Sequence, residues 1–220
     1  MNERRDILVS EIFHSIQGES THAGWPCAFI RLAGCGHGCR FCDTAYAEVG
    51  GVPMTVEAAA ERALSFGAPC IEVTGGEPLL QPGVHALLEL LCDRCPNVLL
   101  ETGGFLPVDR VDPRVLVILD IKPPSSGVSG RNCLGNLEIA LDSPGRFEFK
   151  FVLASREDYL WAREFISANG LAGRCTILFG PVYGELDPER LAAWILEDRL
   201  PVRMQLQLHK HIWHPEARGV

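Results

Sequence analysis

The sequence has no long hydrophobic run and no excess of basic residues. Its longest apolar stretch, residues 115–121, is interrupted by Asp120 and is far too short to cross a bilayer. Residues 1–6 carry charges with no apolar run behind them, so we expect no signal peptide, no membrane anchor and a cytoplasmic location. The 28 Asp and Glu residues outnumber the 20 Lys and Arg residues, and the formal net charge of −8 argues against direct binding to nucleic acid.

The chain also lacks internal repeats, low-complexity tracts and any linker long enough to divide it. We therefore expect a single domain over residues 1–220. Short apolar runs alternate with amphipathic segments along this chain. The strand-like runs are residues 7–13, 28–32, 70–73, 98–100, 115–121, 147–153, 175–179 and 204–208.

Four segments between these runs carry the signals of helices. Thr55, Ser155 and Asp187 are suited to cap three of them, and residues 84–91 place Val and Leu on one face of the fourth. Strands that alternate with helices are typical of parallel α/β folds.

A complete eight-unit barrel needs about 250 residues. The 220 residues therefore favour a partial, open (β/α) barrel of about six units. Residues 103–114 contain two prolines and leave little room for a helix, so we expect some crossover helices to be reduced to loops. A doubly wound sheet is the alternative that the sequence leaves open.

Nine cysteines are many for a chain of this length in a reducing compartment, where disulfides are not the expected use. Three of them, Cys35, Cys39 and Cys42, follow the strand-like run 28–32 at the spacing C-x3-C-x2-C. Parallel α/β folds build their sites at the carboxyl ends of strands, and the glycines at positions 34, 36 and 38 let the backbone wrap tightly. Three thiolates would hold a four-iron cluster and leave one iron open to a small molecule.

Structural zinc and simple packing are the alternatives for this loop. A structural zinc site usually has four ligands, and His37 lies between the first two cysteines, where the loop is too tight for it to join them comfortably. Cys92 and Cys95 close a predicted helix, whereas a thioredoxin-like pair opens one, so we predict that both pack in the interior. The other cysteines expected in the core are Cys27, Cys70, Cys133 and Cys175.

The cysteine loop resembles the radical S-adenosylmethionine superfamily, whose signature is C-x3-C-x-aromatic-C, with Phe41 at the aromatic position. The resemblance implies a [4Fe-4S] cluster on the three cysteines, with S-adenosylmethionine on the open iron. Residues 74–78 are similar to the superfamily's Gly-Gly-Glu motif, and residues 120–126 are similar to its ribose-contacting segment. The residues implied to bind S-adenosylmethionine are Phe41, Gly75, Gly76, Glu77, Lys122, Pro124 and Ser125.

The flanking segments are similar to the 7-carboxy-7-deazaguanine synthase family of queuosine and 7-deazapurine biosynthesis. The similarity lies in residues 12–20, 24–26, 29–35, 42–44 and 207–213, and it extends over nearly the whole chain. It implies conversion of 6-carboxy-5,6,7,8-tetrahydropterin to 7-carboxy-7-deazaguanine with loss of ammonia. A 5′-deoxyadenosyl radical takes a hydrogen from the substrate, the ring contracts, and the hydrogen is returned.

The same resemblance implies a substrate site formed by Ile16, Gln17, Gly18, Glu19, Arg31, Thr74 and His209. The side chains at positions 17 and 19 suit the polar edge of a pterin, and Arg31 suits its carboxylate. Taken singly, Glu19 and Arg31 would be an ordinary ion pair, and Gln17 would cap a turn. Thr44 matches the family's Mg2+ ligand by resemblance alone, and no side chain is assigned a catalytic role beyond the cluster and cofactor.

The resemblance further implies a flavodoxin-like or ferredoxin-like electron donor and a homodimer. Two other functions stay open. An activase of a glycyl-radical enzyme shares the cluster spacing but gives no reason for residues 16–19 or Arg31. A non-enzymatic zinc-binding or iron–sulfur electron-carrier module needs only the cysteine loop.

The C-terminal segment departs from the family pattern. In some relatives the terminal carboxylate approaches the substrate soon after a His-Lys pair. Here residues 215–220 follow that pair, and the sequence leaves the roles of Pro215, Arg218 and Val220 open.

Overall fold

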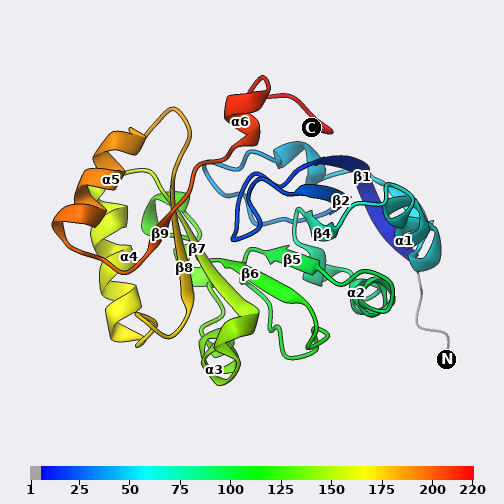
Figure 1. Ribbon diagram of the computed structural model, residues 1–220, viewed down its shortest axis with the longest axis horizontal. Coiled ribbons are helices and arrows are strands. Elements are labelled where there is room, and N and C mark those ends of the chain that lie inside the picture. The colour runs from blue at the N-terminus through cyan, green and yellow to red at the C-terminus, as the bar shows by residue number, and fades with distance from the viewer. Residues whose placement is uncertain (1–5) are drawn as a thin grey trace.

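The structure, a computed structural model, describes residues 6–220; residues 1–5, part of the segment behind the expectation about a signal peptide, lie outside the described residues. At its centre is one nine-stranded sheet with the order β3-β1-β2-β4-β5-β6-β7-β8-β9 (Figure 1). The strands are β1 (Asp6–Ile16), β2 (Pro26–Leu32), β3 (Val52–Thr55), β4 (Cys70–Gly75), β5 (Val98–Thr102), β6 (Leu116–Asp120), β7 (Phe147–Leu153), β8 (Thr176–Pro181) and β9 (Arg203–Met204).

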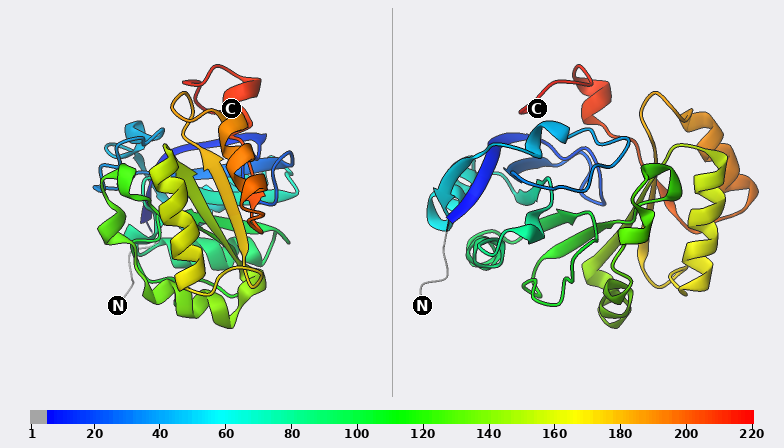
Figure 2. Two further views of the ribbon diagram at one scale, coloured as in Figure 1. Left: turned by 90° about the vertical axis from the view of Figure 1, so that its left-hand side faces the viewer. Right: turned by 180° about the vertical axis from the view of Figure 1, so that it is seen from behind.

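Most of this sheet is parallel. Every neighbouring pair from β2 to β9 is parallel, whereas β1 is antiparallel to both β2 and β3. Over residues 6–220 no ladder joins the edge strands β3 and β9, so the sheet stays open while it curves (Figure 2). The predicted open partial barrel is confirmed.

The helices are α1 (Val56–Leu64), α2 (Val84–Cys92), α3 (Gly135–Asp142), α4 (Arg156–Ala168), α5 (Pro188–Glu197) and α6 (His209–Ile212). Four of them, α1, α2, α4 and α5, lie on the outer side of the curved sheet (Figure 2). The three predicted caps are confirmed, because Thr55, Ser155 and Asp187 each accept a backbone N–H of the first turn that follows. In the described part of the chain no helix is long and apolar enough to cross a membrane.

Two clusters of buried apolar side chains lie on opposite faces of the sheet. The larger one joins the outer face to the helices and includes Leu87, Leu91 and Phe149. The smaller one, on the inner face, consists of Cys27, Phe29, Cys70, Leu99 and Ile118. Successive residues of a strand point to opposite faces, so the same strands supply both clusters. The inner cluster forms a floor beneath the carboxyl ends of the strands.

The cysteines outside the loop mostly pack as predicted. Cys95 belongs to the larger cluster, and Cys92 and Cys175 are half-buried against it. Cys133 is half-buried and lies in neither cluster, so its assignment to the core is wrong. It belongs to the turn that leads into α3, where its carbonyl accepts the Asn136 N–H, and not to a strand.

The last predicted strand, residues 204–208, is also wrong beyond its first residue. β9 contains only Arg203 and Met204, and the chain then leaves the sheet toward α6. The backbone N–H of Leu208 donates to the carbonyl of Gly18 instead of to a strand. This path carries the C-terminal segment across to the opposite side of the open sheet (Figure 1).

Candidate active site

A cavity of about 900 Å³ opens at the carboxyl ends of the parallel strands. Its wall is formed by the cysteine loop, by the ends of β1 and β2, by inner-face residues of β4 to β7, and by the C-terminal segment. This is the position at which parallel α/β folds build their sites.

The cysteine loop brings its three thiols to one cavity. Cys35, Cys39 and Cys42 all line it, and burial raises the pKa of the first two thiols. Gly34, Gly36 and Gly38 have φ values of 93°, 69° and 69°, a left-handed backbone that favours glycine. Three soft sulfur donors on one loop fit three corners of a [4Fe-4S] cluster. Within residues 6–220 no three His, Cys, Asp or Glu side chains are placed to hold a single metal ion.

The end of β4 lies directly against this loop. A Cβ atom on Gly76 would lie 2.4 Å from the carbonyl oxygen of Gly34 and 2.8 Å from the Cβ of Cys35. The amide of Glu77 donates to the same carbonyl of Gly34 at 2.9 Å. The Gly-Gly pair therefore holds the cysteine loop against the sheet.

The residues predicted to bind S-adenosylmethionine divide into two groups. Those that line the cavity are Phe41, Gly75, Gly76 and Lys122. Glu77, Pro124 and Ser125 are not among its lining residues. Glu77 is fully buried behind the wall, where it accepts hydrogen bonds from the Thr102 hydroxyl at 2.7 Å and the Gly103 amide at 2.9 Å.

The predicted substrate residues are brought together. Ile16, Gln17, Gly18, Glu19, Arg31, Thr74 and His209 all line the cavity. The Gln17 side chain caps a turn, since its oxygen accepts the Glu19 amide at 3.0 Å, and its nitrogen donates to Glu72.

The ordinary ion pair between Glu19 and Arg31 does not form. Glu19 pairs with Lys150 at 2.7 Å, and Arg31 pairs with Glu11 at 2.8 Å. Glu19 also accepts hydrogen bonds from the Gln207 and Gln205 amides at 3.0 and 3.3 Å.

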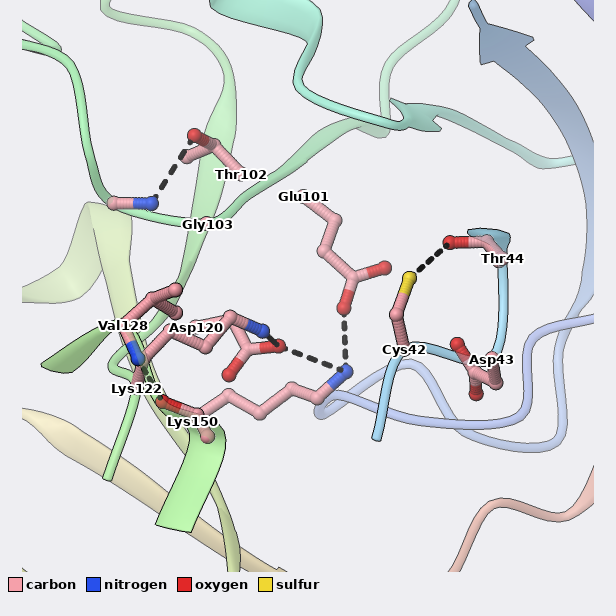
Figure 3. A network of polar contacts seen from close by, with 12 residues as sticks. Cys42, Asp43, Thr44, Glu101, Thr102, Gly103, Asp120, Lys122, Val128 and Lys150 are labelled. Carbon is pink, nitrogen blue, oxygen red and sulfur yellow. Dashed lines mark hydrogen bonds and ion pairs between the residues drawn. The ribbon is translucent and has the colours of Figure 1, made fainter. Parts of the chain in front are cut away.

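A charged network on the inner face was not predicted. Lys150 of β7 contacts Glu101 of β5 at 2.5 Å and lies 3.9 Å from Asp120 of β6 (Figure 3). Asp120 in turn pairs with Lys122 at 2.6 Å. The signal was present as the alternation of Phe and charged residues along residues 147–151, which is typical of a strand with two different faces.

Glu72 of β4 is a further buried carboxyl of this inner face. Burial, followed by repulsion from Glu101, raises the pKa of Glu72 well above its ordinary value. Its neighbour Glu101 behaves in the opposite way. Burial opposes its charge, but Lys150 holds the pKa of Glu101 below the ordinary value.

The loop after Cys42 continues the wall. The Thr44 hydroxyl lies 3.7 Å from the Cys42 sulfur and lines the cavity (Figure 3). Asp43 pairs with Lys210 at 2.8 Å and accepts the Gln207 amide at 3.1 Å. The C-terminal segment is thereby joined to the cysteine loop.

Residues 215–220 complete the wall, so the departing C-terminal segment belongs to the site. Within it, the Arg218 guanidinium carbon lies 4.0 Å from the centre of the Tyr46 ring. Tyr46 follows Thr44 in a short 3-10 turn and donates its hydroxyl to Glu11 at 2.7 Å.

Known proteins resemble this chain in sequence and in fold. The model of the radical SAM superfamily matches residues 29–117. A 7-carboxy-7-deazaguanine synthase of Chlorobaculum tepidum is 65% identical over 220 residues, which cover all of both chains. One of Koribacter versatilis is 39% identical over 96% of this chain and 99% of its own.

The structural comparison agrees. The crystal structure of QueE from Escherichia coli superposes with a TM-score of 0.75 at 24% identity, over 92% of this chain and 95% of that chain. At that identity the likeness shows the fold alone, whereas the sequence identities above extend over the full length. The superfamily implies a [4Fe-4S] cluster and S-adenosylmethionine, and the donor set of the cysteine loop fits that cluster. The chain belongs to the 7-carboxy-7-deazaguanine synthase family of the radical SAM superfamily.

Proposed function

We propose that the protein converts 6-carboxy-5,6,7,8-tetrahydropterin to 7-carboxy-7-deazaguanine with loss of ammonia, as a step in 7-deazapurine and queuosine biosynthesis. One observation carries the proposal: the three thiols of the cysteine loop share a single cavity with Gln17, Glu19 and Arg31. The full-length identity to relatives named for this activity supports it.

The cluster and cofactor supply a carbon-centred radical that abstracts hydrogen from the substrate. We assign the cluster to Cys35, Cys39 and Cys42. The cofactor is assigned to the cavity residues Phe41, Gly75, Gly76 and Lys122, with Glu77, Pro124 and Ser125 as neighbouring support. The glycines act through their backbone, because a Cβ on Gly75 would meet the backbone of Leu32 and a Cβ on Gly76 would meet that of Gly34.

The substrate binds, on this proposal, in the same cavity as the thiols of the cysteine loop, beside Arg31 and Glu19. The terminal nitrogens of Arg31 are free to bind the substrate carboxylate, because only its Nε is bonded to Glu11 among the described residues. Glu19, Thr74 and His209, with the backbone of residues 16–18, are assigned to the pterin edge. The cavity walls hold the substrate in place and exclude water from a reactive centre.

Thr44 is the proposed protein ligand of Mg2+. Its hydroxyl lines the cavity beside Cys42, on the side where the substrate is assigned. Mg2+ keeps several waters and takes few protein ligands, so one hydroxyl is an adequate anchor when the substrate supplies a further oxygen.

We also propose that a flavodoxin-like or ferredoxin-like protein donates the electron and that the protein is a cytoplasmic homodimer. Residues 1–220 are proposed to form a single domain. Exposure of Gly36, Gly38 and Arg40 on the cysteine loop supports access for a donor. The exposed apolar residues Leu8 and Val52 at the edge of the sheet support pairing with a second copy. None of the nine cysteines, all of which lie within residues 6–220, is joined in a disulfide, as a reducing compartment favours.

A small-molecule substrate is favoured over a protein substrate. Residues 215–220 form part of the cavity wall, and the cavity of about 900 Å³ is of a size suited to a small-molecule ligand. No observation on the described residues gives the activase an advantage of its own.

The test is an anaerobic turnover assay. Reduced protein with a reconstituted cluster, given S-adenosylmethionine, Mg2+ and carboxytetrahydropterin, is expected to form carboxydeazaguanine, measured by chromatography and mass. Cleavage of S-adenosylmethionine without that product would contradict the proposed substrate. Purified protein with one zinc and no iron would contradict the radical chemistry itself.

A further inference from the structure

The positive side chains of the cavity wall differ in whether a carboxylate already neutralises them. Each lysine forms an ion pair: Lys122 with Asp120 at 2.6 Å, Lys150 with Glu19 at 2.7 Å, and Lys210 with Asp43 at 2.8 Å. Arg31 has Glu11. Among residues 6–220, Arg218 is the lysine or arginine of this wall for which no carboxylate lies within ion-pair distance.

Arg218 and Arg31 lie beside the same aromatic ring. The guanidinium carbons of Arg218 and Arg31 are 4.0 and 5.9 Å from the centre of the Tyr46 ring. The Tyr46 hydroxyl and the Arg31 Nε donate to one oxygen of Glu11, at 2.7 and 2.8 Å. The Tyr46 ring is therefore a neighbour of both guanidinium groups, and Glu11 fixes this ring and Arg31 relative to each other.

Both guanidinium groups keep donors for an incoming anion. Arg31 uses only its Nε within the described chain, and its terminal nitrogens are not sealed in the interior. Arg218 is exposed, its guanidinium carbon lies over the Tyr46 ring, and no hydrogen bond to the described residues uses its N–H donors. A carboxylate has about four lone-pair positions, enough to accept hydrogen bonds from two guanidinium groups.

The local backbone places Arg218 at this wall. The Ala217 amide donates to the His214 carbonyl at 2.8 Å, a turn that redirects the chain after α6. Gly219 has a φ of 69°, and a Cβ there would come within 4.0 Å of the Phe13 Cβ on β1. Arg218 lies between these two residues, near β1 and beside the Tyr46 ring.

We propose that Arg218 binds the carboxylate of the substrate together with Arg31, and that the C-terminal segment in this way selects a 6-carboxylated pterin over a neutral one. This inference rests on the proposed function. Discrimination of this kind arises because a carboxylate forms charge-assisted hydrogen bonds with both guanidinium groups, and a neutral analogue does not. Arg218 acts here in binding and specificity and takes no part in hydrogen transfer.

The test compares binding of unreactive 6-carboxypterin and of neutral 6-hydroxymethylpterin to the cluster-loaded protein, by fluorescence titration. A hydrogen bond to a charged group contributes about 1.5–3 kcal/mol, so Arg218→Ala is expected to weaken 6-carboxypterin binding roughly tenfold to a hundredfold. Binding of the neutral analogue is expected to change less than about threefold. Arg218→Lys keeps the charge without the planar fork and is expected to recover part of the lost affinity.

Turnover gives the second readout. Arg218→Ala is expected to raise KM for carboxytetrahydropterin by the same factor while kcat and the cluster absorbance stay close to wild type. Arg94→Ala, which removes an exposed ion pair with Glu61 away from the cavity, is the control and is expected to change neither ligand's affinity.

The outcomes separate the two proposals. Wild-type protein that forms no carboxydeazaguanine would overturn the proposed function, and this inference with it. Wild-type protein that forms product, with Arg218→Ala binding both pterins as wild type does, would overturn the inference alone. Equal weakening of both pterins would likewise overturn it, because a loss without discrimination means that Arg218 only holds the segment in place. A protein truncated after Ala217 gives one further comparison. If it loses the preference for 6-carboxypterin while Arg218→Ala keeps it, the preference belongs to the terminal carboxylate and not to Arg218.

Discussion

Several charged side chains are buried on the inner face of the sheet. Lys150 and Glu72 are 4% and 3% exposed, so neither is solvated as a surface charge would be. The lysine remains charged because three carboxylates surround it, whereas burial and like charges favour the neutral form of Glu72. The same inner face therefore holds two carboxyls whose pKa values are shifted in opposite directions, that of Glu72 upward and that of Glu101 downward.

The state of Glu72 leads to a prediction about pH. A carboxyl whose pKa is higher in the folded protein than in the unfolded chain, where it is about 4.3, opposes folding as the pH rises above the unfolded value. Glu72→Gln keeps an oxygen for the Gln17 amide and removes this opposition. The variant is expected to be more stable than wild type at pH 8, by on the order of 1 kcal/mol, and nearly equal to it at pH 4. Thermal unfolding at the two pH values measures this, and equal stabilisation at both would contradict the raised pKa.

Arg31 gives a second prediction at this scale. Its Nε is used by Glu11, and its terminal nitrogens are assigned to the substrate carboxylate. Arg31→Lys keeps the charge but cannot satisfy both partners with one ammonium group. We expect binding of 6-carboxypterin to fall roughly tenfold or more, while the cluster absorbance is unchanged. Loss of the cluster in this variant would show that Arg31 supports the cysteine loop and not the substrate.

Part of the site could be predicted from sequence. The predictable part consists of residues that are close to one another along the chain. The three cysteines assigned to the cluster lie within eight consecutive positions, so their spacing alone predicts one site. The bond from Lys150 to Glu101 joins residues 49 positions apart, and the Lys150–Glu19 pair joins more distant ones. Which residues pair in this way depends on the order of the strands in the sheet. The local sequence pattern does not reveal that order. Glu11 was missed for the same reason, because its pairing with Arg31 depends on the β1–β2 register.

Elements of secondary structure follow the same division between local and distant causes. The central strands are apolar runs buried on both faces, and the sequence predicts them well. β3 has four mostly exposed residues and exists because it pairs with β1, so no apolar run marks it. The short β9 was overestimated, because the polar contacts of Gln205 and Gln207 with the opposite wall divert the chain from the sheet.

The contact between β4 and the cysteine loop predicts the effect of a single methyl group. Gly76→Ala would place a Cβ 2.4 Å from the Gly34 carbonyl, so the loop must move. We expect less iron per protein after reconstitution, at least about a twofold loss, because the thiols no longer meet at the cluster geometry. Gly130→Ala is the matched control, since a Cβ there meets nothing within 4 Å. Full iron content in Gly76→Ala would mean that the loop adapts without changing the site.

The described part of the molecule is an open barrel, and its C-terminal segment connects the last strand to the loops after β1 and β2. β3 and β9 are the edge strands, and no ladder joins them in the described part of the chain. Beyond β9, the Gln205 side chain accepts the Ser20 amide at 2.8 Å, and Lys210 pairs with Asp43 at 2.8 Å. The segment thus crosses from the last strand to the loops after β1 and β2 (Figure 1).

The contacts between the C-terminal segment and the loops after β1 and β2 lead to a prediction about coupling. They are expected to affect how much S-adenosylmethionine is cleaved for each product molecule formed. The double variant Gln205→Ala/Gln207→Ala removes amide contacts to Glu19 and Asp43 without touching the cysteines. The loop of residues 17–25 is expected to exchange its amide hydrogens faster, because its bonds to the C-terminal segment are lost. A less enclosed cavity admits water, so more S-adenosylmethionine should be cleaved per product formed, by at least about twofold.

Two measurements check this expectation together: hydrogen exchange by mass spectrometry, and the ratio of 5′-deoxyadenosine to carboxydeazaguanine. Arg163→Ala, which breaks a pair with Asp198 between α4 and α5 on the outer side, is the control for a general loss of stability. If the sheet alone enclosed the cavity, the double variant would show the same hydrogen exchange and the same product ratio as wild type. A change confined to residues 17–25 and the ratio, absent from the control, would instead place the closing of this open barrel in its C-terminal segment.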